Sequence, residues 1–257
     1  VAPSKFTLPS TRVMPRQIII HAGFHKTGTT SVQATLHANS TRLWPTHALV
    51  LPKRINEVTR ISTLHSVTRG PMSLEEFRSR MVAFLRELSL GQKRGLIISA
   101  ENLSGLIPGR REHDGYEACP DLMAATESCV HEVWGEDVAL SLMFGLRDPV
   151  TWVRSAYWQN VRSSRLLDDY DTFVARYCTV DLADTVRQVR QAVKAAKVVT
   201  VALEDVRDLP LGPAAPLFDM ARLRPDLRAG LVAGQTANTS PDPATIAACL
   251  DLNRSEL

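Results

Sequence analysis

Cysteine is scarce in this chain, and the few cysteines that occur lie far apart. The 257 residues include four cysteines and seven histidines, and no Cys-x-x-Cys pair is present. A structural zinc site needs closely spaced ligands, and a disulfide framework needs paired cysteines. We therefore predict reduced thiols and no bound metal for a chain whose cysteines are Cys119, Cys129, Cys178 and Cys249.

Long hydrophobic runs are missing as well. No stretch of about 18 apolar residues occurs, so we expect no integral membrane segment. Residues 1–16, VAPSKFTLPSTRVMPR, lack the apolar core of a signal peptide and read as a polar lead-in. These absences predict a cytoplasmic protein whose single domain covers residues 17–257.

The chain has no large excess of positive or negative charge. A formal net charge of +3 favours anionic ligands only slightly. A nucleic-acid-binding protein typically carries a strongly basic surface, so we expect no nucleic-acid partner. The hydrophobic content of 44% is ordinary for a globular protein and is enough for a large core.

What the chain does contain is a regular alternation of strand and helix patterns. Five short apolar runs are separated by stretches with apolar residues at spacings of three and four. This predicts an α/β fold with a mostly parallel central sheet of about five strands flanked by helices. Strands are expected at residues 17–22, 47–51, 95–100, 139–146 and 197–202, and helices at 29–38, 73–90, 121–134, 149–163 and 181–195. The rest of 41–70, together with 104–119 and the proline-rich 207–216, reads as irregular.

The segment QIIIHAGFHKTGTTSVQ, residues 17–33, joins a buried strand to a glycine-containing turn and a helix start. Gly23 and Gly28 permit a tight turn, and Thr29 and Thr30 stand where the helix begins. The N–H groups of a first helical turn have no partner within the helix and carry the positive end of its dipole. With the charge of Lys26 added, this layout predicts an anion site. A tight structural turn is the alternative.

The order of residues in this turn distinguishes classes of nucleotide-binding protein. In the ATP and GTP loop, GxxxxGK[ST], lysine follows the second glycine, whereas Lys26 precedes Gly28. The sequence KTGTT resembles the 5'-phosphosulfate loop of sulfotransferases that use 3'-phosphoadenosine 5'-phosphosulfate (PAPS). Ser31 and its successors are more similar to the bacterial and carbohydrate branch. The resemblance implies a P-loop-like sulfotransferase fold and donor-binding residues Gly23, Phe24, His25, Lys26, Thr27, Gly28, Thr29 and Thr30.

A second strand-to-helix segment, VALSLMFGLRDPVTWVRSAYWQNVRSS at residues 138–164, supports this resemblance. In the family's 3'-phosphate element, an arginine at the strand end is followed eight residues later by a serine. Arg147 and Ser155 occupy these two positions. Asp148 and Pro149 suit the N-cap and first turn of a helix, which places Ser155 about two turns along. The alternative is a plain helix start with a surface arginine.

The resemblance also predicts the catalytic residues. ISAENLSG, following the third strand, is similar to the stretch in which carbohydrate-type relatives carry a catalytic glutamate, which predicts Glu101 as the base. His25, inside the phosphosulfate loop, is the rival base. Lys26 is expected to stabilise charge on the leaving nucleotide. The late segment QTANTSP resembles an Asn-x-Ser tail of the bacterial branch, which assigns Asn238 to the nucleotide.

The residues that follow Arg147 carry two further expectations. Trp152, Tyr157 and Trp158 are candidates for stacking on adenine, although at least two are expected in the core. Arg162 belongs to a basic helix side that is either solvated or faces an acidic acceptor. Acceptor-pocket residues are expected from 41–70 and 104–119.

Together these patterns predict a PAPS-dependent sulfotransferase that transfers a sulfuryl group in line to a hydroxyl or amine. The acceptor is a small molecule or a glycan, and no metal is required. A nucleotide kinase or NTPase, a non-catalytic nucleotide-binding protein and a nucleic-acid module are the alternatives. The sequence leaves the particular acceptor and the oligomeric state open.

Overall fold

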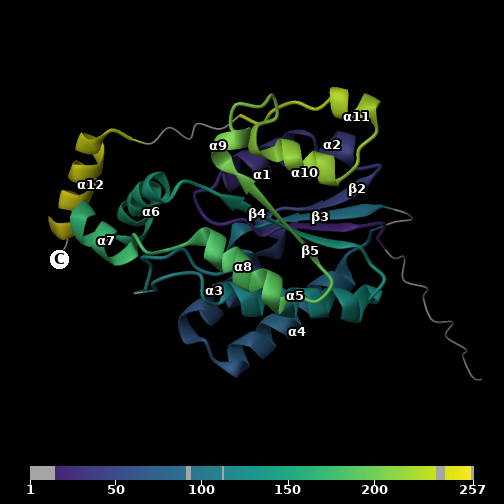
Figure 1. Cartoon of the computed structure of the whole chain (residues 1–257), viewed down its shortest axis with the longest axis horizontal. Helices are drawn as coiled ribbons and strands as arrows, with labels where there is room; N and C mark the ends of the chain where they lie inside the picture. The colour runs from purple at the N-terminus through teal and green to yellow at the C-terminus, as the bar shows by residue number, and fades with distance from the viewer. Residues whose placement is uncertain (1–14, 91–93, 112, 236–240, 256–257) are drawn as a thin grey trace, which may run out of the picture.

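The protein folds around one five-stranded parallel sheet, which confirms the predicted α/β class (Figure 1). The structure is a computed structural model that describes residues 15–90, 94–111, 113–235 and 241–255. The strand order is β2-β3-β1-β4-β5, and each neighbouring pair is parallel. The strands are β1 (Ile18–His21), β2 (His47–Val50), β3 (Gly95–Ser99), β4 (Leu140–Leu146) and β5 (Lys197–Ala202).

Strand β1 lies at the centre of this sheet and is buried on both faces. Ile18 and Ile20 belong to one hydrophobic cluster, whereas Ile19 belongs to the other, as the two-residue repeat of a strand requires. Its register pairs Ile18 with Leu96 of β3 and with Leu140 of β4. A continuous apolar run is the expected sequence of a parallel strand covered by helices on both sides.

Helices cover both faces of the sheet (Figure 1). One face is covered by α3 (Asn56–Thr68), α4 (Pro71–Glu87), α5 (Cys119–Trp134) and α8 (Leu182–Ala192). The other face is covered by α1 (Thr29–Ala38) and α10 (Ala215–Met220), with the short α2 (Ser40–Leu43), α9 (Leu203–Val206) and α11 (Pro225–Ala229) nearby. Single-turn elements are η1 (Pro52–Ile55), η2 (Glu101–Ser104) and η3 (Gly212–Ala214).

Three further helices stand beside one another at one end of the molecule: α6 (Pro149–Ser164), α7 (Tyr170–Tyr177) and α12 (Pro243–Ser255) (Figure 1). The Asn253 amide of α12 donates to the carbonyls of Val161, 2.8 Å away, and Leu166, 3.1 Å away. These bonds satisfy the Val161 carbonyl in the last turn of α6 and the Leu166 carbonyl just after the helix. Helix α12 therefore fixes the end of α6.

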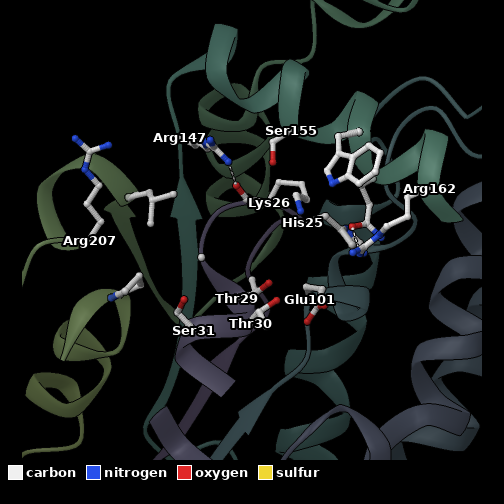
Figure 2. Close-up of a pocket in the computed structure, with 15 residues that line it drawn as sticks. His25, Lys26, Thr29, Thr30, Ser31, Glu101, Arg147, Ser155, Arg162 and Arg207 are labelled. Atoms are coloured by element: carbon white, nitrogen blue, oxygen red, sulfur yellow. Dashed lines mark hydrogen bonds between the residues drawn. The ribbon is translucent and has the colours of Figure 1, made fainter. Parts of the chain in front are cut away.

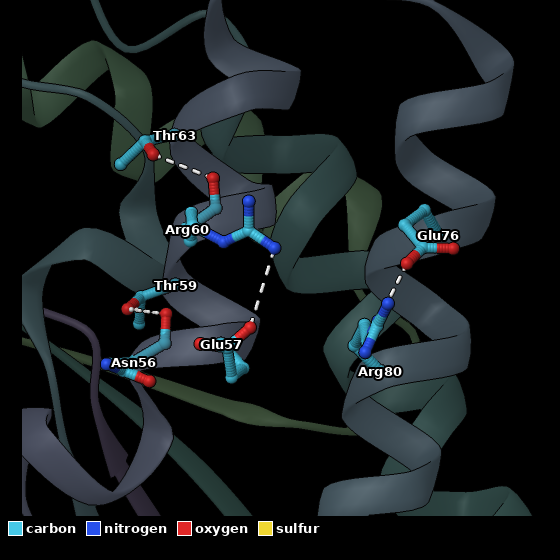
Figure 3. A network of polar contacts seen from close by, with 7 residues as sticks. All are labelled: Asn56, Glu57, Thr59, Arg60, Thr63, Glu76 and Arg80. Atoms are coloured by element: carbon cyan, nitrogen blue, oxygen red, sulfur yellow. Dashed lines mark hydrogen bonds and ion pairs between the residues drawn. The ribbon is translucent and has the colours of Figure 1, made fainter.

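Helix α3 corrects the prediction that residues 41–70, apart from the strand, are irregular. Its sequence is rich in β-branched and polar residues, which have low intrinsic helix propensity. Val58, Ile61, Ser62 and His65 are nonetheless buried, so tertiary packing, not local preference, stabilises this helix. Exposed ion pairs lie on the outer faces of α3 and α4, for example Glu76 with Arg80 (Figure 3). Such pairs contribute little to stability.

A buried carboxylate determines where α8 ends. Helix α8 stops at Ala192, three residues before the predicted end. The Glu127 carboxylate accepts backbone hydrogen bonds from Lys194 at 2.7 Å, Ala195 at 2.8 Å and Ala196 at 2.6 Å. These three donors turn toward α5, so the chain leaves the helix and enters β5 at Lys197.

Candidate membrane spans are lacking among the described helices: none combines the length and the apolar character that crossing a bilayer needs.

Candidate functional site

The candidate site lies at the carboxyl edge of the sheet, where the order of strands reverses. The chain runs from β1 to the edge strand β2, returns through β3, and then continues on the other side of β1 with β4 and β5. In open parallel sheets, ligands bind in the crevice at such a switch point. The loops after β1, β3, β4 and β5 all reach this edge.

The loop after β1 has a left-handed backbone at three positions. The φ angles are 52° at Gly23, 67° at Lys26 and 91° at Gly28. A Cβ atom on Gly23 would lie 2.7 Å from the Thr29 methyl carbon, and one on Gly28 would lie 2.9 Å from Leu203 Cδ1. Both glycines are therefore required by conformation and by space. Lys26 takes the same unfavourable region, which is a strain typical of functional loops.

The carbonyl groups of this loop are held by donors from the protein. Ser104 donates to Gly23 O at 2.5 Å, and Trp152 Nε1 donates to His25 O at 2.9 Å. Thr27 Oγ1 donates to Phe24 O at 2.7 Å, and Arg147 Nη1 donates to Lys26 O at 2.9 Å. With four consecutive carbonyls occupied, the loop offers an anion N–H groups and an ammonium group rather than competing oxygens.

The helix α1 begins directly after this loop. Gly28 is its N-cap and has no side chain with which to cap the first turn, and no acidic residue lies in that turn. The N–H groups of the first turn thus have no acceptor within the helix. Burial, followed by the charges of Arg162 and Arg147, lowers the pKa of Lys26 below its usual value. Burial is the larger cause and the two guanidinium groups add to it, so a bound anion would favour the charged form of Lys26.

A cavity of about 550 Å³ opens in front of the loop (Figure 2). This volume lies within the range of about 300–1,000 Å³ that is usual for small-molecule sites. Glu101 is the only acidic residue among those that line the cavity, against four lysine and arginine residues. The lining residues are His25, Lys26, Gly28, Thr29, Thr30, Ser31, Glu101, Arg147, Ser155, Trp158, Gln159, Arg162, Leu203, Arg207 and Pro213.

Arg147 and Ser155 come to this cavity from the β4–α6 junction. Asp148 caps α6 by accepting from Thr151 N at 2.9 Å, and Pro149 occupies the first turn, as predicted. Arg147 also donates from Nε to Thr151 Oγ1 at 3.3 Å, so its guanidinium bridges α6 and the β1 loop. The sequence places these residues more than a hundred positions from Lys26, yet all three line one cavity (Figure 2).

Glu101 lines the same cavity from η2, directly after β3. Its Oε2 accepts from Gln33 Nε2 of α1 at 2.5 Å, which fixes the carboxylate at the first-turn side of that helix. Thr29, Thr30 and Glu101 lie together in this part of the site (Figure 2). The carboxylate can accept a proton from a ligand that reaches the loop.

His25 has both ring nitrogens occupied. Nε2 lies 2.6 Å from Asn102 Oδ1, and because a carbonyl oxygen only accepts, Nε2 carries the proton. Nδ1 then accepts from the Tyr116 hydroxyl at 3.0 Å, and this hydroxyl in turn accepts from the His25 backbone N–H at 3.2 Å. Burial lowers the pKa of the imidazole. His25 is therefore a neutral ring that ties the loop to η2 and to the segment before α5.

The other predicted site residues lie elsewhere. Gly23, Phe24 and Thr27 are buried parts of the loop and are not among the cavity-lining residues. The Phe24 ring packs 4.7 Å from Tyr116, and Thr27 fills the space above Gly145. Asn238 lies outside the described residues. Trp152 and Tyr157 are in the core, as expected for two of the three aromatics.

Several lining residues were not predicted for this site. Leu203, Arg207 and Pro213 come from the segment after β5, where a proline-rich connection was expected, and Gln159 comes from α6. One feature of the sequence could have identified the residues after β5: a fifth parallel strand must end at the same edge of the sheet as the other four, so the segment that follows it also reaches the site. Conversely, no described residue of 41–70 or 104–119 lines this cavity, although acceptor contacts were predicted there.

A scan against protein-family models gives no match to this chain, and a search of curated protein sequences gives none either. No group of three or more His, Cys, Asp and Glu side chains suited to a metal ion occurs in the described parts of the chain.

Proposed function

We propose that this protein is a PAPS-dependent sulfotransferase of the bacterial or carbohydrate type, built on the P-loop-like sulfotransferase fold. One observation carries the proposal. Lys26, Glu101 and Arg147 follow three different strands, Ser155 lies on α6 after the third of them, and all four line one cavity at the switch point of the sheet. Cytoplasmic location stays a prediction from the sequence.

The arrangement fits a nucleotide with phosphates at both ends of its ribose. The loop, Lys26 and the start of α1 form one anion site, and Arg147 with Ser155 forms a second. Two sites suit PAPS, whose 3'-phosphate distinguishes it from ATP. Thr29 and Thr30 add hydroxyl groups at the first site (Figure 2).

In the proposed reaction, PAPS supplies the sulfuryl group. Glu101 accepts the proton of the acceptor hydroxyl or amine, and Lys26 with the loop N–H groups stabilises negative charge on the departing phosphate oxygens. Gln33 holds the Glu101 carboxylate in place. Arg147 and Ser155 fix the nucleotide, so that the reacting groups are aligned before transfer.

Glu101 is a better candidate for the base than His25. The hydrogen bonds of His25 to Asn102 and Tyr116 occupy both ring nitrogens, so neither nitrogen is open to the proton of an acceptor. We assign His25 the role of holding the loop.

Sulfuryl transfer from ³⁵S-labelled PAPS to a panel of carbohydrate, phenol and amine acceptors tests this proposal. Wild type is expected to label at least one acceptor. Glu101→Gln is expected to lose transfer by at least 100-fold while still binding the desulfated product 3',5'-phosphoadenosine (PAP). Glu132→Gln, on the exposed side of α5, is the matched control and is expected to retain transfer. Glu101→Gln with wild-type turnover would remove Glu101 from its role, and PAP binding without any transfer would favour a non-catalytic protein.

A further inference from the structure

Basic side chains gather at the Glu101 end of the cavity. Arg162 of α6 lines the cavity on the same side as His25 and Glu101, whereas Arg207 and Ser31 lie on the other side (Figure 2). Under the proposed function, Lys26 and Arg147 face the phosphates of the donor. Arg162 lies on the Glu101 side of the cavity, where the proposed base requires the acceptor hydroxyl or amine.

Arg162 has no carboxylate partner among the described residues. Its Nη2 donates to the neutral amide oxygen of Gln159 at 3.2 Å, and its guanidinium carbon lies 5.9 Å from the centre of the Trp158 ring. Gln159 and Trp158 line the cavity too. A partly exposed indole and a guanidinium side by side form a surface on which a ring can stack while an attached anion is bound.

A second guanidinium, that of Arg110, contacts the same helix at the next residue. Arg110 donates to the hydroxyl of Ser163, the residue after Arg162, and its own Nε is buried without a partner among the described residues. Its positive charge acts on His25. No described acid pairs with it. A partly buried cation that is bound only by a hydroxyl is poorly compensated, and a nearby anion would stabilise it.

We propose that the acceptor carries an anionic group of its own, such as a carboxylate or a sulfate, which Arg162 binds beside the hydroxyl that faces Glu101, with Arg110 adding its charge from its place next to Ser163. This inference rests on the proposed function. An acidic saccharide has the required chemistry, because its ring can stack on Trp158 while its anion reaches Arg162.

The transfer step itself is unchanged by the anion. The acceptor oxygen forms a bond to sulfur as the bond between sulfur and the bridging oxygen of PAPS breaks. The acceptor proton goes to Glu101, and the electron pair of the broken bond leaves with PAP. The anionic group takes no part in the bond changes, so Arg162 is a specificity residue that orients the acceptor.

Matched pairs of acceptors test this inference. Methyl β-glucuronide is compared with methyl β-glucoside, and 4-hydroxybenzoate with 4-hydroxybenzyl alcohol, by measuring kcat/KM for PAP formation. Wild type is expected to prefer the anionic member of at least one pair by about tenfold or more. Arg162→Gln is expected to remove that preference, and Arg162→Lys to keep part of it. The two members of a pair are compared at saturating PAPS, so a change in donor affinity does not affect the comparison. Arg110→Gln is expected to reduce the preference less.

Arg154→Gln serves as the control, because Arg154 is on the same helix but is exposed and outside the cavity. Equal or better use of the neutral members, no transfer to any anionic member, or an equal loss for both members in Arg162→Gln would overturn the inference. A wild-type protein that does not bind PAP would instead refute the proposed function, so the two failures are distinct.

Discussion

Replacing Glu127 by glutamine should destabilise the protein by about 2–3 kcal/mol. The Glu127 side chain is buried, with 4% of its surface exposed, and its carboxylate binds three consecutive backbone N–H groups before β5. Glutamine keeps one acceptor oxygen and places an amide donor against the remaining N–H. The loss of one hydrogen bond to a charged group costs about 1.5–3 kcal/mol, and the bonds that remain are weakened by the loss of charge.

Urea denaturation at pH 7 measures this change in the free energy of unfolding. Glu132→Gln is the matched control, because this neighbour on α5 makes an exposed ion pair with Arg86 and should change stability by less than about 0.5 kcal/mol. A change for Glu127→Gln as small as that of the control would refute the structural role of the carboxylate.

The pH dependence gives an independent check. Burial alone would raise the pKa of the Glu127 carboxyl, but the three backbone donors lower it overall, below the usual value of 4.5. Since the folded-state pKa is depressed, the stabilisation is present above about pH 4.5 and is lost as pH falls below it. The difference between wild type and Glu127→Gln should therefore narrow between pH 5 and pH 3.

Three further predictions concern the site and its surroundings. Lys26→Ala should reduce sulfuryl transfer by about 10²–10³-fold, because it removes a preorganised charge; steady-state kinetics showing a near-normal rate would exclude that role. Gly28→Ala and Gly135→Ala both place alanine at φ near 90°, but only a Cβ on Gly28 meets neighbouring atoms, so only Gly28→Ala should weaken PAP binding. Burial lowers the pKa of His21 and of His47 to about 4. The free energy of unfolding should therefore be greatest above pH 6.5 and fall by about 2 kcal/mol for each histidine between pH 7 and pH 5. Urea unfolding at the two pH values measures this fall, which should be smaller in His47→Gln.

The sheet and the centre of the site could be predicted because their signals are local. The run Ile18–Ile20 identifies a buried strand, and the glycine, lysine and threonine pattern after it identifies a turn that feeds a helix. All five predicted strands occur, with ends shifted by at most one residue. Asp148 and Pro149 likewise predicted the start of α6 correctly.

Other features depend on contacts between distant residues and could not be predicted from local sequence. Helix α3 is stabilised by its packing against α4, despite residues of low helix propensity. The end of α8 is set by Glu127, which is more than sixty residues away. Leu203 and Pro213 reach the cavity because β5 pairs with β4, and the sequence after β5 gives no sign of what it will face.

The most direct test of the central claim is calorimetric titration of the purified protein with PAP, and in parallel with ATP and Mg²⁺. Wild type and the exposed control Arg154→Ala should bind PAP with micromolar affinity and should not bind ATP comparably. Arg147→Ala should lose most of this affinity, because Arg147 would hold the 3'-phosphate from its place beside Lys26. A preference for ATP would contradict the account in favour of a kinase or NTPase, and a protein that binds neither nucleotide would contradict it altogether.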